Sequence, residues 1–352
     1  MASAIDPIRT EITELGEFAL IDHLTKHIQL YHTSTQKGVG DDAAVMQFGN
    51  TNTLLSTDLL IEGIHFDLSY TPLKHLGYKA VAMNISDIAA MNGIASHMII
   101  GIAVSNRFSL EALEELYEGI LLACKRYRID LVGGDTTSSN AGLMIAVTMT
   151  GTANTEEICY RAGAKTGDLL CVSGDLGSAY MGLLLLEREK AVFQANPHAQ
   201  PELDGYDYVL ERQLKPEPRT DIIEALKENG IKPTSMIDVS DGLASEIMHL
   251  CKNSGLGCHV YEEKIPIDAT TINLAEEFKI IPSVAALNGG EDYELLFTID
   301  QKDYEAIRKL NNISIIGHMT EAETEALLIT PDNQAVNIQA QGWDAFKKRT
   351  KH

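Results

Sequence analysis

The first half of the chain alternates between two hydrophobic patterns. Short apolar runs predict strands, and longer runs with apolar residues three and four positions apart predict helices. The longest run begins with Pro72, which suits a first helical turn, and its apolar composition predicts a buried helix. The predicted helices of this half are 15–29, 72–91 and 110–128, and the predicted strands are 43–48, 53–60, 98–104, 129–132 and 143–151.

The second half continues the alternation. A strand over 168–174 leads into a helix that opens near Asp175, and a polar segment over 194–207 then interrupts the pattern as an insertion. Alternating helices and strands predict an α/β (α+β) fold, and the chain is long enough for two domains. Because the strand over 143–151 closes the first half, we divide the chain into 1–153 and 154–352. The remaining predicted strands are 235–240, 257–262, 293–299, 313–319 and 326–330.

Composition and cysteine usage narrow the class of protein. Of the 352 residues, 45% are apolar and 22% are charged, which is typical of a globular protein with room for two domains. No apolar run approaches the roughly 18 residues of a membrane span, and the acidic N-terminal segment lacks the apolar region of a secretory signal. The five cysteines form no C-x-x-C pair, so we expect reduced thiols in a cytoplasmic protein. Because no apolar run is long enough to span a membrane, we expect no membrane partner.

The net charge further limits the partners. The chain carries 28 basic and 50 acidic residues, for a net charge of −22. This balance argues against a nucleic acid or an anionic membrane surface, because phosphate backbones need a basic surface. A small phosphorylated ligand stays possible, since bound metal ions reverse the local sign of a site.

Aspartates recur beside glycine, serine and threonine. One Asp-Gly pair is ordinary turn chemistry, so each aspartate taken alone is read as a turn or cap residue. Taken together they favour a second interpretation, in which the aspartates converge and bind metal ions. Carboxylates about 4 Å apart repel by roughly 4 kcal/mol at an effective dielectric near 20, so they need cations to stay ionised. Hard oxygen ligands of this kind suit Mg²⁺. Spacing alone does not choose between the two. The segments are GVGDD (38–42), STD (56–58), NISD (84–87), GGD (133–135), DVSDG (238–242) and GGED (289–292), which we place at turns and strand ends.

Three familiar nucleotide motifs do not explain these segments. GVGDDA formally satisfies the dinucleotide fingerprint, but HTSTQK precedes it where an apolar strand should be, and two carboxylates stand where pyrophosphate would approach. The dipeptide Gly-Lys is absent, which excludes a P-loop, and the protein-kinase motifs HRD and DFG are also missing.

DVSDG lacks the spacing of an EF-hand loop, so we expect Ser240 or Asp241 to cap the following helix.

Three further side chains each allow two interpretations. Arg161 lies in a glycine-rich turn and is either a surface residue or a phosphate clamp, since a guanidinium bonds oxygens in pairs. His65 is either structural or part of a site. Trp343, the only tryptophan, either packs the C-terminal segment or stacks on a ligand.

Eight segments, in chain order, resemble the thiamine-monophosphate kinase family. They extend from residue 38 to residue 346. The wider superfamily, which is similar to aminoimidazole ribonucleotide synthetase and selenophosphate synthetase, shares the GGD and SDG elements, whereas STD-x-x-x-E-G-x-H-F and GWD-x-F favour the kinase. The segments are GVGDDAAV, STDLLIEGIHF, YKAVAMNISDIAAM, LVGGDTTSS, YRAGAKTGD, DVSDGLASEI, NGGEDYELLF and QGWDAF.

The resemblance implies a function and a set of roles. It implies a two-domain aminoimidazole ribonucleotide synthetase-like fold, a homodimer paired through its N-terminal domains, and direct in-line transfer from ATP to thiamine monophosphate. No general base is expected, because the acceptor is already a phosphate oxyanion. Implied ligands of several Mg²⁺ ions are Asp42, Ser56, Thr57, Asp58, Asp87, Asp135, Asp238 and Asp241. Implied ATP contacts are Tyr117, Gly134, Asp135, Arg161 and Ser240, and implied substrate contacts are His65, Glu291 and Trp343.

Two other functions stay open at this point. A related synthetase or maturation factor would consume ATP without depending on thiamine monophosphate. An acidic protein that binds divalent metal without turnover would show no affinity for nucleotide.

Overall fold

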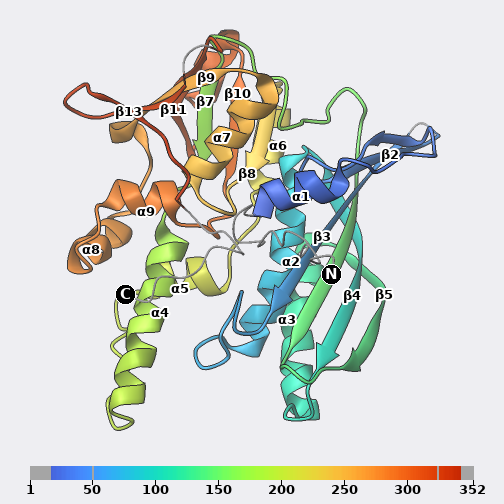
Figure 1. Cartoon of the computed structure of the whole chain (residues 1–352), viewed down its shortest axis with the longest axis vertical. Coiled ribbons are helices and arrows are strands. Elements are labelled where there is room, and N and C mark those ends of the chain that lie inside the picture. Colours follow the sequence, from blue (N-terminus) through green and yellow to red (C-terminus); the bar gives the residue numbers. More distant parts are fainter. Residues whose placement is uncertain (1–16, 50, 323–324, 342–352) are drawn as a thin grey trace, which may run out of the picture.

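The computed structural model describes residues 17–49, 51–322 and 325–341, which form two α/β units, each built on its own sheet (Figure 1). The first unit contains α1 (Glu17–Thr25), β1 (Thr35–Lys37), β2 (Ala44–Phe48), β3 (Thr51–Ile61), α2 (Leu73–Ala90), β4 (Ile94–Val104), α3 (Leu110–Tyr127), β5 (Asp130–Ser138) and β6 (Met144–Ala153). The second contains β7 (Leu169–Ser173), α4 (Ser178–Ala195), α5 (Asp207–Leu214), α6 (Thr220–Glu228), β8 (Ser235–Asp238), α7 (Leu243–Ser254), β9 (Gly257–Tyr261), η2 (Glu262–Lys264), α8 (Ala269–Glu277), α9 (Pro282–Asn288), β10 (Leu295–Ile299), η3 (Gln301–Asp303), α10 (Tyr304–Ile307), β11 (Ile313–Thr320), β12 (Ala326–Ile329) and β13 (Ala335–Asn337).

The first sheet has the strand order β1-β2-β3-β6-β4-β5, and α2 and α3 cover one of its faces (Figure 1). Its pairs are antiparallel except β4 with β5, which run parallel. Buried and accessible positions alternate along β3 and β6, as expected for a sheet with one packed face. On the opposite face, Leu59 and Ile99 stay 46% and 48% exposed.

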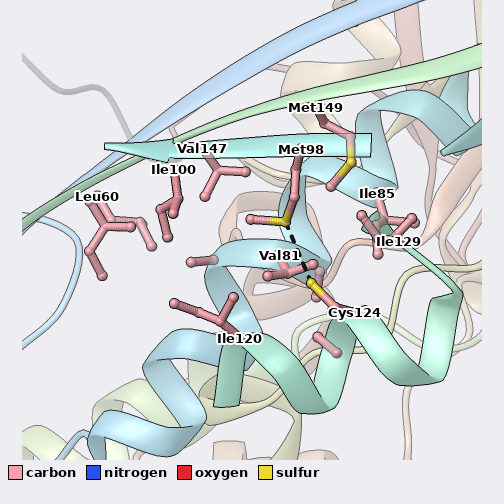
Figure 2. Packing of buried hydrophobic residues seen from close by; sticks show 14 of the residues in the cluster. Leu60, Val81, Ile85, Met98, Ile100, Ile120, Cys124, Ile129, Val147 and Met149 are labelled. Atoms are coloured by element: carbon pink, nitrogen blue, oxygen red, sulfur yellow. Dashed lines mark hydrogen bonds between the residues drawn. The ribbon is translucent and has the colours of Figure 1, made fainter. Parts of the chain in front are cut away.

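The core of the first unit lies between this sheet and the two helices. Figure 2 shows Val81 of α2 and Ile120 of α3 packed beneath Ile100 and Val147 of the sheet. The helices approach closely because glycines face each other, and a Cβ at Gly77 would lie 2.1 Å from the Leu116 carbonyl oxygen. This packing fixes the position of α2, which carries the NISD segment.

The second sheet has the order β13-β12-β9-β11-β7-β10-β8, antiparallel except for β9 with β12. Strand β10 is buried along its whole length because both faces are covered. Leu296 belongs to one apolar cluster, and its neighbour Phe297 belongs to a second cluster on the other face. None of the helices in the described ranges is long and apolar enough to cross a bilayer.

Most of the predicted elements are confirmed, but the predicted GGD turn is wrong, because β5 runs on through Asp135 to Ser138. Asp58 lies inside β3 and Asp87 lies inside α2, as the predicted strand 53–60 and helix 72–91 place them, and not at turns. Two further predictions fail at helix ends. The first helix ends at Thr25 rather than near residue 29, and Gly242, with no side-chain cap, precedes α7 in place of a Ser240 or Asp241 cap.

Helix α2 connects the two units. It contacts β8, α5 and α6 of the second unit as well as the first sheet. Tyr78 donates a hydrogen bond of 2.8 Å to Glu217, and Ser86 donates one of 2.7 Å to Asp238. One helix therefore positions groups at the junction of the units.

Candidate active site

Three aspartates from separate segments converge at this junction. Asp42 precedes β2, Asp87 lies on α2, and Asp238 ends β8. Each offers a carboxylate oxygen, and these oxygens lie within 4.8 Å of one another. The folded chain thus gathers the GVGDD, NISD and DVSD segments. Asp87 and Asp238 follow Asp42 in the sequence by 45 and 196 positions.

Hydroxyl groups and a fourth carboxylate surround the cluster. Ser56 donates a hydrogen bond to Asp87, and Ser86 donates one to Asp238. Burial, followed by the charge of Asp58, raises the pKa of Asp87 well above its usual range. Burial and the charge of Asp42 raise the pKa of Asp238 to about 7, and burial raises the pKa of Asp58 to about 6. Asp58 therefore belongs to the same electrostatic cluster.

The donor set fits a divalent cation. Burial and mutual repulsion make the ionised aspartates costly unless positive charge lies among them. Asp42 Oδ2 is buried and accepts no hydrogen bond from any residue in the described ranges. Carboxylate and hydroxyl oxygens are the ligands that Mg²⁺ takes in proteins, so Asp42, Ser56, Asp58, Asp87 and Asp238 form a suitable set.

Arg161 lies at the cluster, which decides against the surface interpretation. Its Nη2 donates to Asp42 Oδ1 at 2.7 Å, and its backbone N–H donates to Asp41 Oδ1 at 3.1 Å. Asp41 was missed by the sequence analysis, although its place in the DD pair was a signal. Its side chain is buried, and burial raises its pKa to about 6. The Asp41–Asp42 pair thus anchors Arg161 by both its backbone and its guanidinium.

Three of the predicted ATP contacts line one hollow beside β5. Tyr117, Gly134 and Asp135 surround a cavity of about 390 Å³ together with Ile100, and Tyr117 also borders an adjoining apolar cavity of about 260 Å³. A Cβ at Gly134 would lie 2.0 Å from the Ile100 carbonyl oxygen, so only glycine fits there. A hollow lined by an aromatic ring, by glycine backbone that a ligand can approach closely, and by a carboxylate can accept a flat heterocycle joined to a polar group.

This hollow is separate from the aspartate cluster within one chain. Asp58 pairs with Val147, Val147 pairs with Ile100, and Ile100 pairs with Gly134. These four residues are on successive strands about 4.8 Å apart, so Gly134 lies about 14 Å from Asp58. Asp135 is therefore not gathered with the other predicted metal ligands.

Three other predicted residues also lie outside the cluster of three aspartates. Thr57 is exposed and donates to the Val147 carbonyl oxygen at 2.9 Å. The Asp241 N–H donates to buried Glu246 at 2.9 Å, another carboxylate that the sequence analysis missed. Ser240 accepts a 2.7 Å hydrogen bond from the Glu291 N–H on its carbonyl oxygen, which brings the SDG and GGED segments together.

The predicted substrate contacts His65 and Glu291 lie in one electrostatic neighbourhood. Burial lowers the pKa of His65, and the charge of Glu291 is the next largest influence and raises it. Glu291 is held by Lys79 and Gln213, neither of which the sequence analysis singled out. Trp343 lies outside the described residues.

Comparison with known proteins identifies the family. Residues 40–153 match the family "AIR synthase related protein, N-terminal domain", and residues 165–329 match "AIR synthase related protein, C-terminal domain". A thiamine-monophosphate kinase from Bacillus subtilis (strain 168) is 32% identical over 339 residues, covering 95% of this chain and 100% of the relative. The chain belongs to the thiamine-monophosphate kinase family. The kinase from Aquifex aeolicus (strain VF5) is also 32% identical, over 335 residues, covering 95% of this chain and 99% of its own.

Solved structures agree with this membership in the kinase family. The structure of AaThiL complexed with AMPPCP and TMP has a TM-score of 0.80 at 30% identity, covering 96% of this chain and 99% of that one. HypE of Escherichia coli, a hydrogenase maturation protein, has a TM-score of 0.66 at 18% identity, covering 84% of this chain and 88% of its own. HypE therefore shares the fold alone, whereas the kinases also share the sequence.

Proposed function

We propose that this family member transfers the terminal phosphoryl group of ATP to thiamine monophosphate, directly and in line, to give thiamine diphosphate. The observation that carries the proposal is the convergence of Asp42, Asp87 and Asp238 on one point between the units. Family membership gives the reaction, and the AaThiL structure supports it because that protein is complexed with both AMPPCP and TMP. Phosphoryl transfer needs mainly positioning and charge stabilisation, and this site offers both.

The aspartate cluster would hold several Mg²⁺ ions. This part is supported by the convergence of Asp42, Asp87 and Asp238, by the hydrogen bond from Ser56 to Asp87, and by the effect of the Asp58 charge on Asp87. Bound Mg²⁺ would neutralise the negative charge of the two phosphorylated substrates. The chain itself then orients the two substrates, and it needs no general base because the acceptor is a phosphate oxyanion.

Arg161 and the hollow beside β5 would bind the nucleotide. Arg161 is next to the cluster, where its guanidinium can bond phosphate oxygens in pairs. Tyr117 and Gly134 would border the base or ribose. By the family resemblance, we assign Ser240 to ATP, Thr57 and Asp241 to metal, and Asp135 to both metal and ATP.

We also propose a homodimer in which the first sheet of each copy pairs with that of the other through the face that α2 and α3 do not cover. Leu59 and Ile99 are exposed on this face, and we expect a stable partner to cover them. In such a dimer, Asp135 of one copy could also approach the aspartate cluster of the other copy. Light scattering should give a dimer mass, and Leu59→Glu should lower it. A monomeric wild-type protein would contradict this part.

The domain division proposed with this function is 1–153 for nucleotide, metal and dimerisation and 154–352 for further phosphate, metal and substrate contacts. Arg161, Asp238 and Glu291 belong to the second part by this division. A cytoplasmic location is part of the proposal, and it is supported by the five cysteines, which are free and buried.

A coupled assay of ADP release tests the function. Purified protein with ATP and Mg²⁺ should release ADP with thiamine monophosphate and little with unphosphorylated thiamine, and mass spectrometry should identify thiamine diphosphate. ADP release that ignores thiamine monophosphate would favour a related synthetase. Metal binding without nucleotide affinity would favour a non-catalytic metal protein.

A further inference from the structure

The Glu291 carboxylate is held at both of its oxygens. Lys79 Nζ lies 2.9 Å from Oε1, and Gln213 Nε2 donates to Oε2 at 2.8 Å. Lys79 Nζ also donates to the Gln213 carbonyl oxygen at 3.0 Å. The three residues therefore close a ring of contacts around one carboxylate.

The ring joins both units and has one accessible member. Lys79 lies on α2 of the first unit, Gln213 lies on α5 of the second, and Glu291 follows α9. Lys79 and Gln213 are buried, whereas the Glu291 side chain is 27% exposed. Two buried residues thus fix a carboxylate that solvent or a ligand can reach.

The backbone also restrains this carboxylate. Glu291 has a φ of 69°, in the left-handed region that residues with side chains seldom adopt. Its N–H donates to the Ser240 carbonyl oxygen at 2.7 Å. Such a conformation persists only where the surrounding contacts hold it, and at Glu291 they hold both the backbone and the side chain.

We propose that Lys79 and Gln213 are positioning residues, which fix the Glu291 carboxylate for the cationic ring of the acceptor substrate. The inference rests on the proposed function and on the role that the family resemblance implies for Glu291, which is a contact with thiamine monophosphate, whose thiazolium ring is a cation. Neither positioning residue has to touch the substrate. A carboxylate held in place before binding loses no freedom when the cation arrives, which favours affinity.

Lys79 has two opposing effects on such a site. Its ammonium group holds Glu291 in place, but it also offsets part of the negative charge that would attract a cation. Gln213 carries no charge, so its removal tests the positioning effect alone. Without Lys79, we expect the accessible carboxylate to turn toward water, and the lost position to outweigh the gained charge.

Gln213 offers a substitution that should spare the fold. Its amide nitrogen must face Glu291, because the amide oxygen would be repelled there. That oxygen, Oε1, is buried and accepts no hydrogen bond from the part of the chain that the structure describes. Gln213→Met keeps the volume and removes this unsatisfied oxygen together with the donor, so the melting temperature should hold or rise.

Calorimetric titration with thiamine monophosphate in the absence of ATP tests the proposal. Gln213→Met and Lys79→Met should each bind it roughly tenfold more weakly, equal to about 1.4 kcal/mol. The KM for the acceptor should rise with it, while the KM for ATP and kcat stay close to wild type. Lys79→Arg should recover part of the affinity.

Lys74→Met is the matched control on the same helix. Lys74 forms an exposed ion pair of 3.1 Å with Glu118, so its loss should leave binding unchanged. Unchanged acceptor affinity in Gln213→Met, or tighter binding by Lys79→Met, would overturn the proposal. If Lys79→Met does not fold, Gln213→Met decides. A wild-type protein that neither binds thiamine monophosphate nor turns it over overturns the proposed function and this inference with it, whereas normal wild-type turnover with unaltered variants overturns this inference alone.

Discussion

Ser86 Oγ donates a hydrogen bond of 2.7 Å to Asp238 Oδ2, which joins the two units at the aspartate cluster. Ser86 precedes Asp87 on α2, and Asp238 ends β8. Lys79 lies seven positions earlier on α2, close to two helical turns, and reaches the second unit from the same side. One helix therefore aligns the candidate metal and substrate groups, and disturbing it should affect both.

Asp58→Asn and Asp87→Asn should each abolish phosphoryl transfer while the protein stays folded. A neutral amide is a poor ligand for Mg²⁺, and both aspartates belong to the electrostatic cluster. Removing one charge relieves repulsion, so the melting temperature without metal should rise. The measurements are turnover at saturating Mg²⁺ and thermal unfolding in EDTA, with exposed Asp332→Asn as control. Near-normal turnover in both variants would refute the multi-metal site.

Arg161→Lys should raise the KM for ATP by roughly tenfold, equal to about 1.4 kcal/mol, with a smaller effect on the acceptor. Lysine keeps a point charge but loses the paired bonds of a guanidinium. It would also leave Asp42 with a weaker partner than the present 2.7 Å contact. Steady-state kinetics with each substrate varied in turn gives the answer. A change confined to the acceptor would show that Arg161 serves the other substrate.

The metal-free protein should lose stability as the pH rises from about 4 to about 7. On folding, the pKa of Asp58 rises from 3.8 to about 6, and that of Asp238 rises from 3.8 to about 7. A carboxyl group whose pKa is raised stabilises the folded state below the unfolded pKa and loses this contribution as pH passes the folded pKa. Melting curves in EDTA should show the fall, and Mg²⁺ should stabilise more at pH 7.5 than at pH 5. A Mg²⁺ effect that does not vary with pH would argue against these carboxylates as ligands.

Gly77→Ala should destabilise the first unit by about 1–3 kcal/mol, the usual cost of overpacking. The new Cβ would lie 2.1 Å from the Leu116 carbonyl oxygen, so α2 and α3 would have to separate. Urea unfolding measures the loss. Gly101→Ala is the control, because its Cβ would make an ordinary contact of 3.7 Å with Ala146. Equal stability of the two variants would contradict the close packing.

Trp343→Ala should raise the KM for thiamine monophosphate and leave that for ATP nearly unchanged. An indole face attracts a cation such as thiazolium by roughly 0.5–2 kcal/mol. As the only tryptophan, Trp343 also reports binding through its fluorescence. A lower melting temperature with both constants unaltered, and emission that does not respond to substrate, would assign it to packing instead.

The sequence by itself determined the elements and the family. Apolar periodicity located α2, β3, β6 and every strand of the second sheet except β13, because each pattern reflects how one segment buries its own side chains. The motif order, read as a resemblance, led to the kinase family that the comparisons then showed. The same local signals failed at the GGD segment: its glycines and aspartate resemble a turn, but Asp135 lies within β5.

Only the tertiary structure decided which residues meet. It gathered Asp42, Asp87 and Asp238, placed the hollow beside β5 about three strand spacings from Asp58, and closed Lys79 and Gln213 around Glu291. In the sequence, nothing distinguishes Lys79 from other polar residues on a helix. Its role depends on the packing of α5 and the GGED segment against it. Contacts of this kind depend on the order of strands and on the docking of one unit against the other, which are long-range packing outcomes that no local spacing encodes.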